Sequence, residues 1–220
     1  MSAPQPSDFT FDAASEAEIA QILARYPAGK QASGVIPLLY VAQRQMGRAT
    51  GSAWVPKVAM DVIAERLSMP PIRVYEVATF YFMFNMKPIG RHHLQLCGTT
   101  PCMLRGAGEL MAVCKSKIGP KDTLSADGRF TWQEVECLGA CANAPMAQIN
   151  DFYFEDLTAE TMAEIIDAFA AGKRPKPGSR VGRKSSEPEG GALTLTDPKL
   201  YDGSAARPIG KLPNSDPVTA

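Results

Sequence analysis

Two closely spaced pairs of cysteines constrain the fold of this chain more than any other feature of its sequence. Cys97 and Cys102 enclose four residues in "CGTTPC", and Cys137 and Cys141 enclose three residues in "CLGAC". The first cysteine of each pair ends a predicted strand, in "RHHLQLC" and in "RFTWQEVEC". Because loops held by a rigid sheet can bring side chains to one point, the sequence predicts four thiols gathered beside a sheet.

The segments around these pairs predict an α/β layer. A helical pattern follows the first pair at 102–119, and two short strands are expected at 146–150 and 152–155. A last helix is expected at 158–172 and ends at a glycine. The order of one strand, a helix, three strands and a helix predicts a small, partly antiparallel sheet.

The residues before the sheet predict a small helical domain. The first helix has two candidate N-caps, Asp12 and Ser15, and Glu18 would complete a capping box with Ser15. The last helix is apolar nearly all round, so we expect it to be buried. Four helices are expected, at 12–27, 34–47, 56–69 and 70–84.

Composition and charge divide the chain into three parts. We expect a helical domain at 1–88, a second domain at 89–172 and a flexible C-terminal extension at 173–220. The extension is rich in Pro, Gly, Ser and Lys and lacks periodicity, so it cannot bury much apolar surface. Net charge is +1 for residues 1–88, −5 for 89–171 and +4 for 172–220. An acidic α/β domain therefore precedes a basic extension.

Composition also excludes several classes of protein. The 220 residues are 45% hydrophobic and 21% charged with zero formal net charge, so nothing global indicates nucleic acid binding. No apolar run approaches the ~20 residues of a spanning helix, so we expect no direct membrane insertion. The N-terminus lacks a signal core and an Arg-rich transit pattern, which favours a cytosolic chain with reduced cysteines. An odd count of five cysteines then favours metal or redox chemistry over disulfides.

Four thiolates suit either a structural zinc ion or an iron–sulfur cluster, and the spacing fits both. Small residues next to the cysteines, such as Gly98, Thr99 and Gly139, favour a 2Fe-2S cluster because backbone N–H groups can approach its bridging sulfides. The acidic domain would then disfavour a further electron, which predicts a low potential. Buried structural cysteines are the third interpretation. We assign that role to Cys114, on the apolar side of a predicted helix.

Other motifs argue against competing functions. No C-x-x-C is present for a thiol–disulfide oxidoreductase, and no G-x-G-x-x-G or Walker motif is present for NADH, flavin or nucleotides. Residues 58–81 resemble a helix–turn–helix, but Arg73 is the only cation of the presumed recognition helix. His92 and His93 are expected to be surface or strand residues. The apolar residues at the end of the helical domain form core or a subunit interface: Phe80, Phe82, Met83 and Phe84.

Three motifs together resemble one family. "ATFYFMF", "LCGTTPC" and "VECLGACANAP" are similar to segments of the E-type, 24-kDa-class subunit of NADH–quinone oxidoreductase, respiratory complex I. The resemblance runs from about residue 12 to 172. It implies a helical domain followed by a thioredoxin-like ferredoxin domain. It also implies one 2Fe-2S cluster held by Cys97, Cys102, Cys137 and Cys141.

The resemblance further implies a subunit that works inside a larger assembly. FMN and NADH would lie on a partner flavoprotein subunit, with a neighbouring iron–sulfur subunit, and no catalytic residue is expected on this chain. The assembly would sit on the cytoplasmic side of a bacterial inner membrane. NAD-reducing hydrogenases and NAD-dependent formate dehydrogenases have related subunits, and a zinc-stabilised binding module remains the alternative from another class. The extension lies outside the common pattern. Its basic run from Lys173 to Lys184 is either solvated or lies along an acidic groove of the partner complex.

Overall fold

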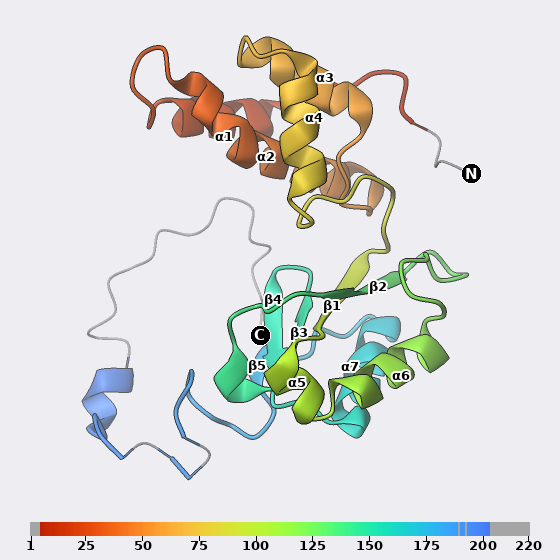
Figure 1. The fold of residues 1–220 in the computed structure, drawn as a ribbon, viewed down its shortest axis with the longest axis vertical. Helices are drawn as coiled ribbons and strands as arrows, with labels where there is room; N and C mark the ends of the chain where they lie inside the picture. Colours follow the sequence, from red (N-terminus) through yellow and green to blue (C-terminus); the bar gives the residue numbers. More distant parts are fainter. Residues whose placement is uncertain (1–4, 189, 192, 203–220) are drawn as a thin grey trace. The chain divides into compact units, whose positions relative to one another are not determined.

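The computed structural model describes residues 5–188, 190–191 and 193–202 and divides the chain into two compact units. One unit contains the residues up to Arg91 together with Leu124–Phe130. The other contains His92–Thr123 and the residues from Thr131 onward. The first unit is helical and the second holds a mixed sheet with helices, which confirms the predicted fold class (Figure 1).

The four predicted N-terminal helices are present, with ends that differ by a few residues. The carboxylate of Asp12 accepts a hydrogen bond from the backbone N–H of Ser15 at 2.7 Å, so Asp12 is the N-cap of the first helix. The second helix continues past Gly47 and ends before Gly51, whose φ of +77° suits a C-terminal glycine. The helices are α1 (Ala13–Leu23), α2 (Val35–Thr50), α3 (Lys57–Arg66) and α4 (Pro71–Phe80).

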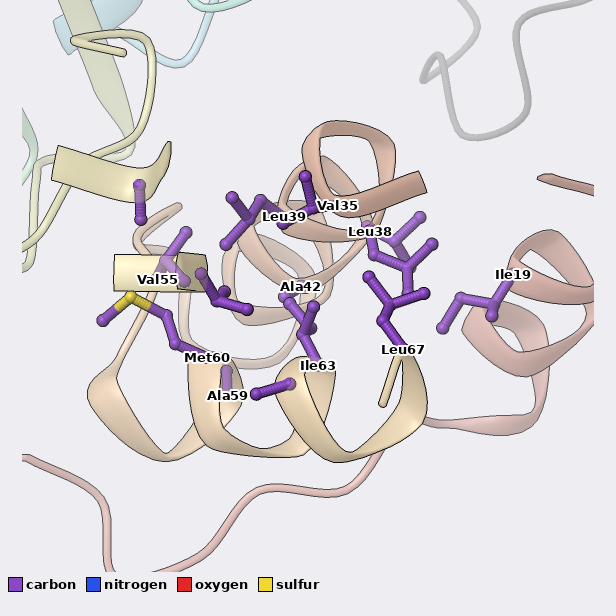
Figure 2. Packing of buried hydrophobic residues seen from close by; sticks show 14 of the residues in the cluster. Ile19, Val35, Leu38, Leu39, Ala42, Val55, Ala59, Met60, Ile63 and Leu67 are labelled. Carbon is purple, nitrogen blue, oxygen red and sulfur yellow. The ribbon is translucent and has the colours of Figure 1, made fainter. Parts of the chain in front are cut away.

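The core of this unit lies between α1, α2 and α3. Figure 2 shows Ile19 of α1, Leu38 of α2 and Ile63 of α3 in one apolar cluster, and all three side chains are fully buried. Each such side chain contributes about 1.5–3 kcal/mol relative to an exposed one. Among the described residues, no helix is both long and apolar enough to cross a lipid bilayer.

Helix α4 differs from the expectation that it is buried all round. Its buried side chains are Val74 and Ala78, whereas Ile72 is 59% exposed and Phe80 is 77% exposed. The helix packs on α3 and α2 through one face only. Of the apolar residues after it, Phe84 is buried and Phe82 is exposed. An apolar sequence cannot by itself distinguish a helix in the core from a helix with a second, uncovered apolar face.

The second unit is built on a five-stranded sheet of order β2-β1-β3-β4-β5. β1 and β3 are antiparallel, with Leu94 opposite Ile149, and β3 and β4 form an antiparallel hairpin that turns at Asn150. Leu94, Ile149 and Phe154 are all buried. The strands are β1 (His92–Cys97), β2 (Phe130–Val135), β3 (Ala147–Ile149), β4 (Phe152–Glu155) and β5 (Gly178–Ser179).

The helical pattern expected at 102–119 is two helices. α5 (Thr100–Leu104) and α6 (Ala107–Lys117) meet at Gly106, whose φ of +105° interrupts the helical backbone. α6 packs against β1 and against α7 (Ala159–Ala170). Thr158 is the N-cap of α7 and forms a capping box with Thr161. Short 3₁₀ helices occur at η1 (Gln31–Gly34), η2 (Cys141–Asn143) and η3 (Pro198–Tyr201).

Part of the segment predicted as a flexible extension is attached to the sheet. β5 pairs in parallel with β4, with Phe154 opposite Gly178. Arg183, assigned to the solvated basic run, is only 12% exposed and forms an ion pair with Asp156. The sequence missed this because two strand residues are too few to show alternation. The rest of the predicted extension at 203–220 lies outside the described residues.

His93 on β1 is a buried strand residue, and His92 is half-buried beside the ring of Phe169. The Nδ1 atom of His93 lies 2.8 Å from the hydroxyl of Thr131, and burial lowers the pKa of His93 to about 4. The ordinary pKa of histidine is ~6.5, so the unfolded chain binds a proton first as pH falls. Stability from the neutral His93 is therefore complete above pH ~6.5 and is lost as pH falls toward 4.

We expect the α/β unit to lose about 2 kcal/mol of unfolding free energy between pH 7 and pH 5 through this residue. The measurement is urea unfolding followed by the fluorescence of Trp132 on β2, in a Trp54→Phe background that leaves one tryptophan. His93→Gln should remove most of that difference between the two pH values. His92→Gln is the control and should preserve it. Equal pH dependence in His93→Gln and in the parent chain would contradict the assignment.

Candidate metal centre

The sheet positions all four cysteines of the two predicted pairs. Cys97 is the last residue of β1, and Cys102 lies on α5 directly after it. Cys137 follows the end of β2 by two residues, and Cys141 begins η2. Because β1 and β2 are neighbours in the sheet, the two ligand loops start from adjacent strands.

Direct contacts hold the two loops together. The backbone N–H of Gly98 donates to the carbonyl of Val135 at 3.0 Å, which joins the start of the first loop to the end of β2. The hydroxyl of Tyr153 on β4 donates to the carbonyl of Leu138 at 2.8 Å. Leu138 and Ala140 of the second loop also pack on the apolar cluster around the first pair, which contains Cys97, Cys102, Ala107, Ala144 and Met146.

The thiols of the two loops differ in how readily they ionise. The Sγ atoms of Cys137 and Cys141 lie 3.3 Å apart. Burial and the neighbouring Cys97 raise the pKa of Cys102 to about 12. Burial also acts to raise the pKa of Cys97, but hydrogen bonds from the hydroxyl and backbone of Thr99 prevail and lower it. Cys97 is thereby the readier of these two thiols to ionise.

Two polar groups in the loops point at sulfur. The hydroxyl oxygen of Thr99 lies 3.2 Å from Cys97 Sγ, and the backbone N–H of Gly139 donates to Cys137 Sγ at 3.4 Å. The Gly139 contact is the main cause of a lowered pKa for Cys137. Gly139 has a φ of +82°, a conformation in which glycine is favoured. Of the small residues singled out in the sequence, Thr99 and Gly139 therefore bring hydrogen-bond donors to the thiols, whereas the N–H of Gly98 donates to Val135.

The two pairs differ in their exposure to solvent. Cys97 and Cys102 are buried, each 1% exposed, whereas Cys137 and Cys141 are exposed. The site therefore has an apolar inner side and an outer side that faces solvent in the isolated chain. Cys114 is not part of this arrangement. It is a buried residue of α6, and burial raises its pKa to about 12.

The donor set fits a two-iron cluster. A 2Fe-2S centre is held by four cysteine thiolates, and the two loops together would supply four. Within the part of the chain that the structure describes, no group of three or more His, Cys, Asp or Glu side chains surrounds a single metal-ion position.

Tyr153 and Arg183 also contact the second loop, and the sequence analysis did not identify either residue. A tyrosine among apolar strand residues was the available signal for Tyr153, and Arg183 gave none.

Comparisons with known proteins identify relatives of this chain. Residues 19–170 match the family model described as thioredoxin-like [2Fe-2S] ferredoxin. The chain is 48% identical over 199 residues to the E 1 subunit of NADH-quinone oxidoreductase of Rhizobium meliloti, covering 89% of this chain and 70% of that protein. It is 49% identical over 162 residues to the E subunit of NADH-quinone oxidoreductase of Rickettsia bellii, covering 73% of this chain and 94% of that protein.

A solved structure shows the same fold at lower identity. A crystal structure of an NAD⁺-reducing [NiFe]-hydrogenase in the air-oxidised state superposes with a TM-score of 0.53 and 21% identity. The match covers 63% of this chain and 23% of the hydrogenase chain, and at this identity it concerns the fold alone. The family model and the two close relatives decide the family. The chain belongs to the thioredoxin-like [2Fe-2S] ferredoxin family, in the group of the NADH-quinone oxidoreductase E subunits.

Proposed function

We propose that this chain is an electron-transfer subunit that binds one 2Fe-2S cluster through Cys97, Cys102, Cys137 and Cys141. The observation that carries the proposal is that two cysteine pairs lie where the adjacent strands β1 and β2 end, in a chain of the [2Fe-2S] family. When bound, such a cluster takes up and releases one electron at a time. Residues 89–172, together with the strand β5 that pairs with their sheet, would form the cluster-binding domain, and residues 1–88 the helical domain.

The residues around the thiols have distinct roles in this proposal. Cys97 and Cys102 hold the inner side under an apolar cover that excludes water. Cys137 and Cys141 hold the outer side, where their exposure leaves a short path for an electron. Thr99 and Gly139 donate hydrogen bonds to thiolate sulfur and so stabilise its negative charge.

The proposed electron partner is the flavoprotein subunit of NADH–quinone oxidoreductase, with FMN and NADH on that subunit. A neighbouring iron–sulfur subunit completes the proposed environment, on the cytoplasmic side of a bacterial inner membrane. Support comes from the names of the two relatives at 48% and 49% identity. The exposed side chains of Met103 and Leu104, directly after Cys102, supply an apolar rim on which a partner can pack.

Two alternatives receive less support. Assembly into an NAD-reducing hydrogenase has only a likeness of fold at 21% identity in its favour. A zinc-stabilised binding module would use the same four thiols, but a single zinc ion requires four ligands around one point. The match of residues 19–170 to a [2Fe-2S] family model favours the cluster over zinc.

The first test is the metal content of the chain purified without oxygen. We expect two irons and two inorganic sulfides per chain, because that is the composition of the proposed cluster. Electron paramagnetic resonance after reduction by dithionite should then show one unpaired electron per chain. One zinc ion per chain, no sulfide and no paramagnetic signal would overturn the proposal and support the binding module.

The second test assigns the ligands by single replacements. Cys→Ser at 97, 102, 137 or 141 should each lose most of the iron and sulfide or change the signal of the reduced cluster. Cys114→Ser is the matched control and should keep both, although burying a hydroxyl in the core costs about 1–3 kcal/mol of stability. A requirement for Cys114 together with a dispensable member of the four would show that the ligand assignment is wrong.

A further inference from the structure

The C-terminal segment 178–187 runs along the edge of the sheet toward the second cysteine loop. β5 pairs with β4, and the backbone N–H of Arg180 donates to the carbonyl of Glu155 at 3.0 Å. The chain then turns, and the backbone N–H of Lys184 donates to the carboxylate of Glu187 at 2.7 Å. These contacts fix the position of Arg183, which lies between them.

Arg183 forms a buried ion pair with Asp156, the residue directly after β4. The carboxylate of Asp156 accepts hydrogen bonds from the Nε and Nη2 atoms of Arg183 and, at 2.6 Å, from the hydroxyl of Ser179. The two side chains are 12% and 7% exposed. Burial acts to raise the pKa of Asp156, but the hydrogen bonds from Arg183 and Ser179 prevail and lower it. Both charges are therefore present together at neutral pH.

This ion pair holds the backbone that follows Cys141. The Nη2 atom of Arg183 donates to the carbonyl of Ala142 at 2.9 Å, and the backbone N–H of Asp156 donates to the carbonyl of Asn143 at 2.8 Å. The side-chain amide of Asn143 in turn donates to the carbonyl of Ser185 at 2.8 Å. The two residues after Cys141 are thus bound by the C-terminal segment and by the end of β4.

We propose that Arg183 is a positioning residue for the cluster: together with Asp156 it anchors the Cys141 loop and balances charge beside it. This rests on the proposed function, because it concerns how firmly the four thiols keep a 2Fe-2S group. The anchoring is specific, since one guanidinium contacts both the carboxylate and the loop carbonyl. Segment 178–187 is then a working part of the cluster-binding unit.

Removal of either charge of this ion pair should shift the reduction potential of the cluster in a direction that can be predicted. Arg183 and Asp156 together are neutral, so removal of either charge leaves the other one beside the loop. Without Arg183, the remaining carboxylate repels an added electron, and the reduction potential should fall. Without the charge of Asp156, the remaining guanidinium attracts the electron, and the potential should rise. A merely structural role would shift both variants in the same direction or neither.

The experiment uses the full chain with its cluster, as the parent protein and as Arg183→Gln, Asp156→Asn and Arg174→Gln. The reduction potential is measured by a titration followed by electron paramagnetic resonance. We expect shifts of opposite sign in the first two variants, changing the ratio of reduced to oxidised cluster at a fixed potential roughly threefold to tenfold. Arg174→Gln removes the same charge from an exposed position of the extension and should leave the ratio within about twofold of the parent.

Cluster retention is measured on the same proteins by the rate of iron loss to a chelator. Arg183→Gln should lose iron about 10- to 100-fold faster than the parent, as expected when a group that orients a metal ligand is removed. A chain ending after Pro188 should behave as the parent, and a chain ending after Gly172 should behave as Arg183→Gln. If Arg183→Gln does not fold, Arg183→Lys keeps the charge and should show a parent-like potential with faster iron loss.

The outcomes separate this inference from the proposed function. A parent chain without two irons and two sulfides would overturn the proposed function itself. A parent chain with its cluster, in which Arg183→Gln and Arg174→Gln share the parent's potential and rate of iron loss, would overturn the role of Arg183 alone. Shifts of the same sign in Arg183→Gln and Asp156→Asn would overturn the charge balance.

Discussion

The convergence of two thiol pairs on adjacent strands is the constraint on which the cluster-binding unit depends. Four cysteines from distant parts of the sequence can act together only if β1 and β2 are neighbours and their loops start side by side. The hydrogen bond from Gly98 to Val135 fixes that start, and Tyr153 on β4 holds the second loop by a hydrogen bond to Leu138. The order of the strands in the sheet thus brings the two cysteine loops side by side.

The proposed site has two requirements that conflict, and each pair of cysteines meets one of them. A cluster needs an apolar environment that limits attack by water, and an electron carrier needs a surface that a partner can approach. Cys97 and Cys102 meet the first requirement by burial, and Cys137 and Cys141 meet the second by exposure. The exposed apolar face of α4 in the helical unit is a separate feature. The sequence predicted that helix to be buried and left the choice between core and interface open only for Phe80, Phe82, Met83 and Phe84.

The sequence was most informative where a local pattern determines a local structure. Periodicity and turn residues predicted strand β1, the β3–β4 hairpin, α7 and the burial of Cys114. The spacing of the other four cysteines indicated a metal site. It was least informative where distant residues determine the outcome. Arg183 sits in a Pro- and Gly-rich stretch with no periodicity, and its partner Asp156 is a turn residue, so neither shows a local sign of pairing. Burial of one face of α4 similarly depends on which helices it meets.

Arg183 follows all four cysteines in the sequence, and this order sets an order of events during synthesis. A ribosome completes all four thiols of the site, and the residues as far as Asn143, before it makes the segment that anchors them. Under the proposed role of Arg183, a nascent chain has the four cysteines before it has the segment that anchors their second loop. A chain that includes segment 178–187 would then hold iron and sulfide more firmly than a chain that ends before it.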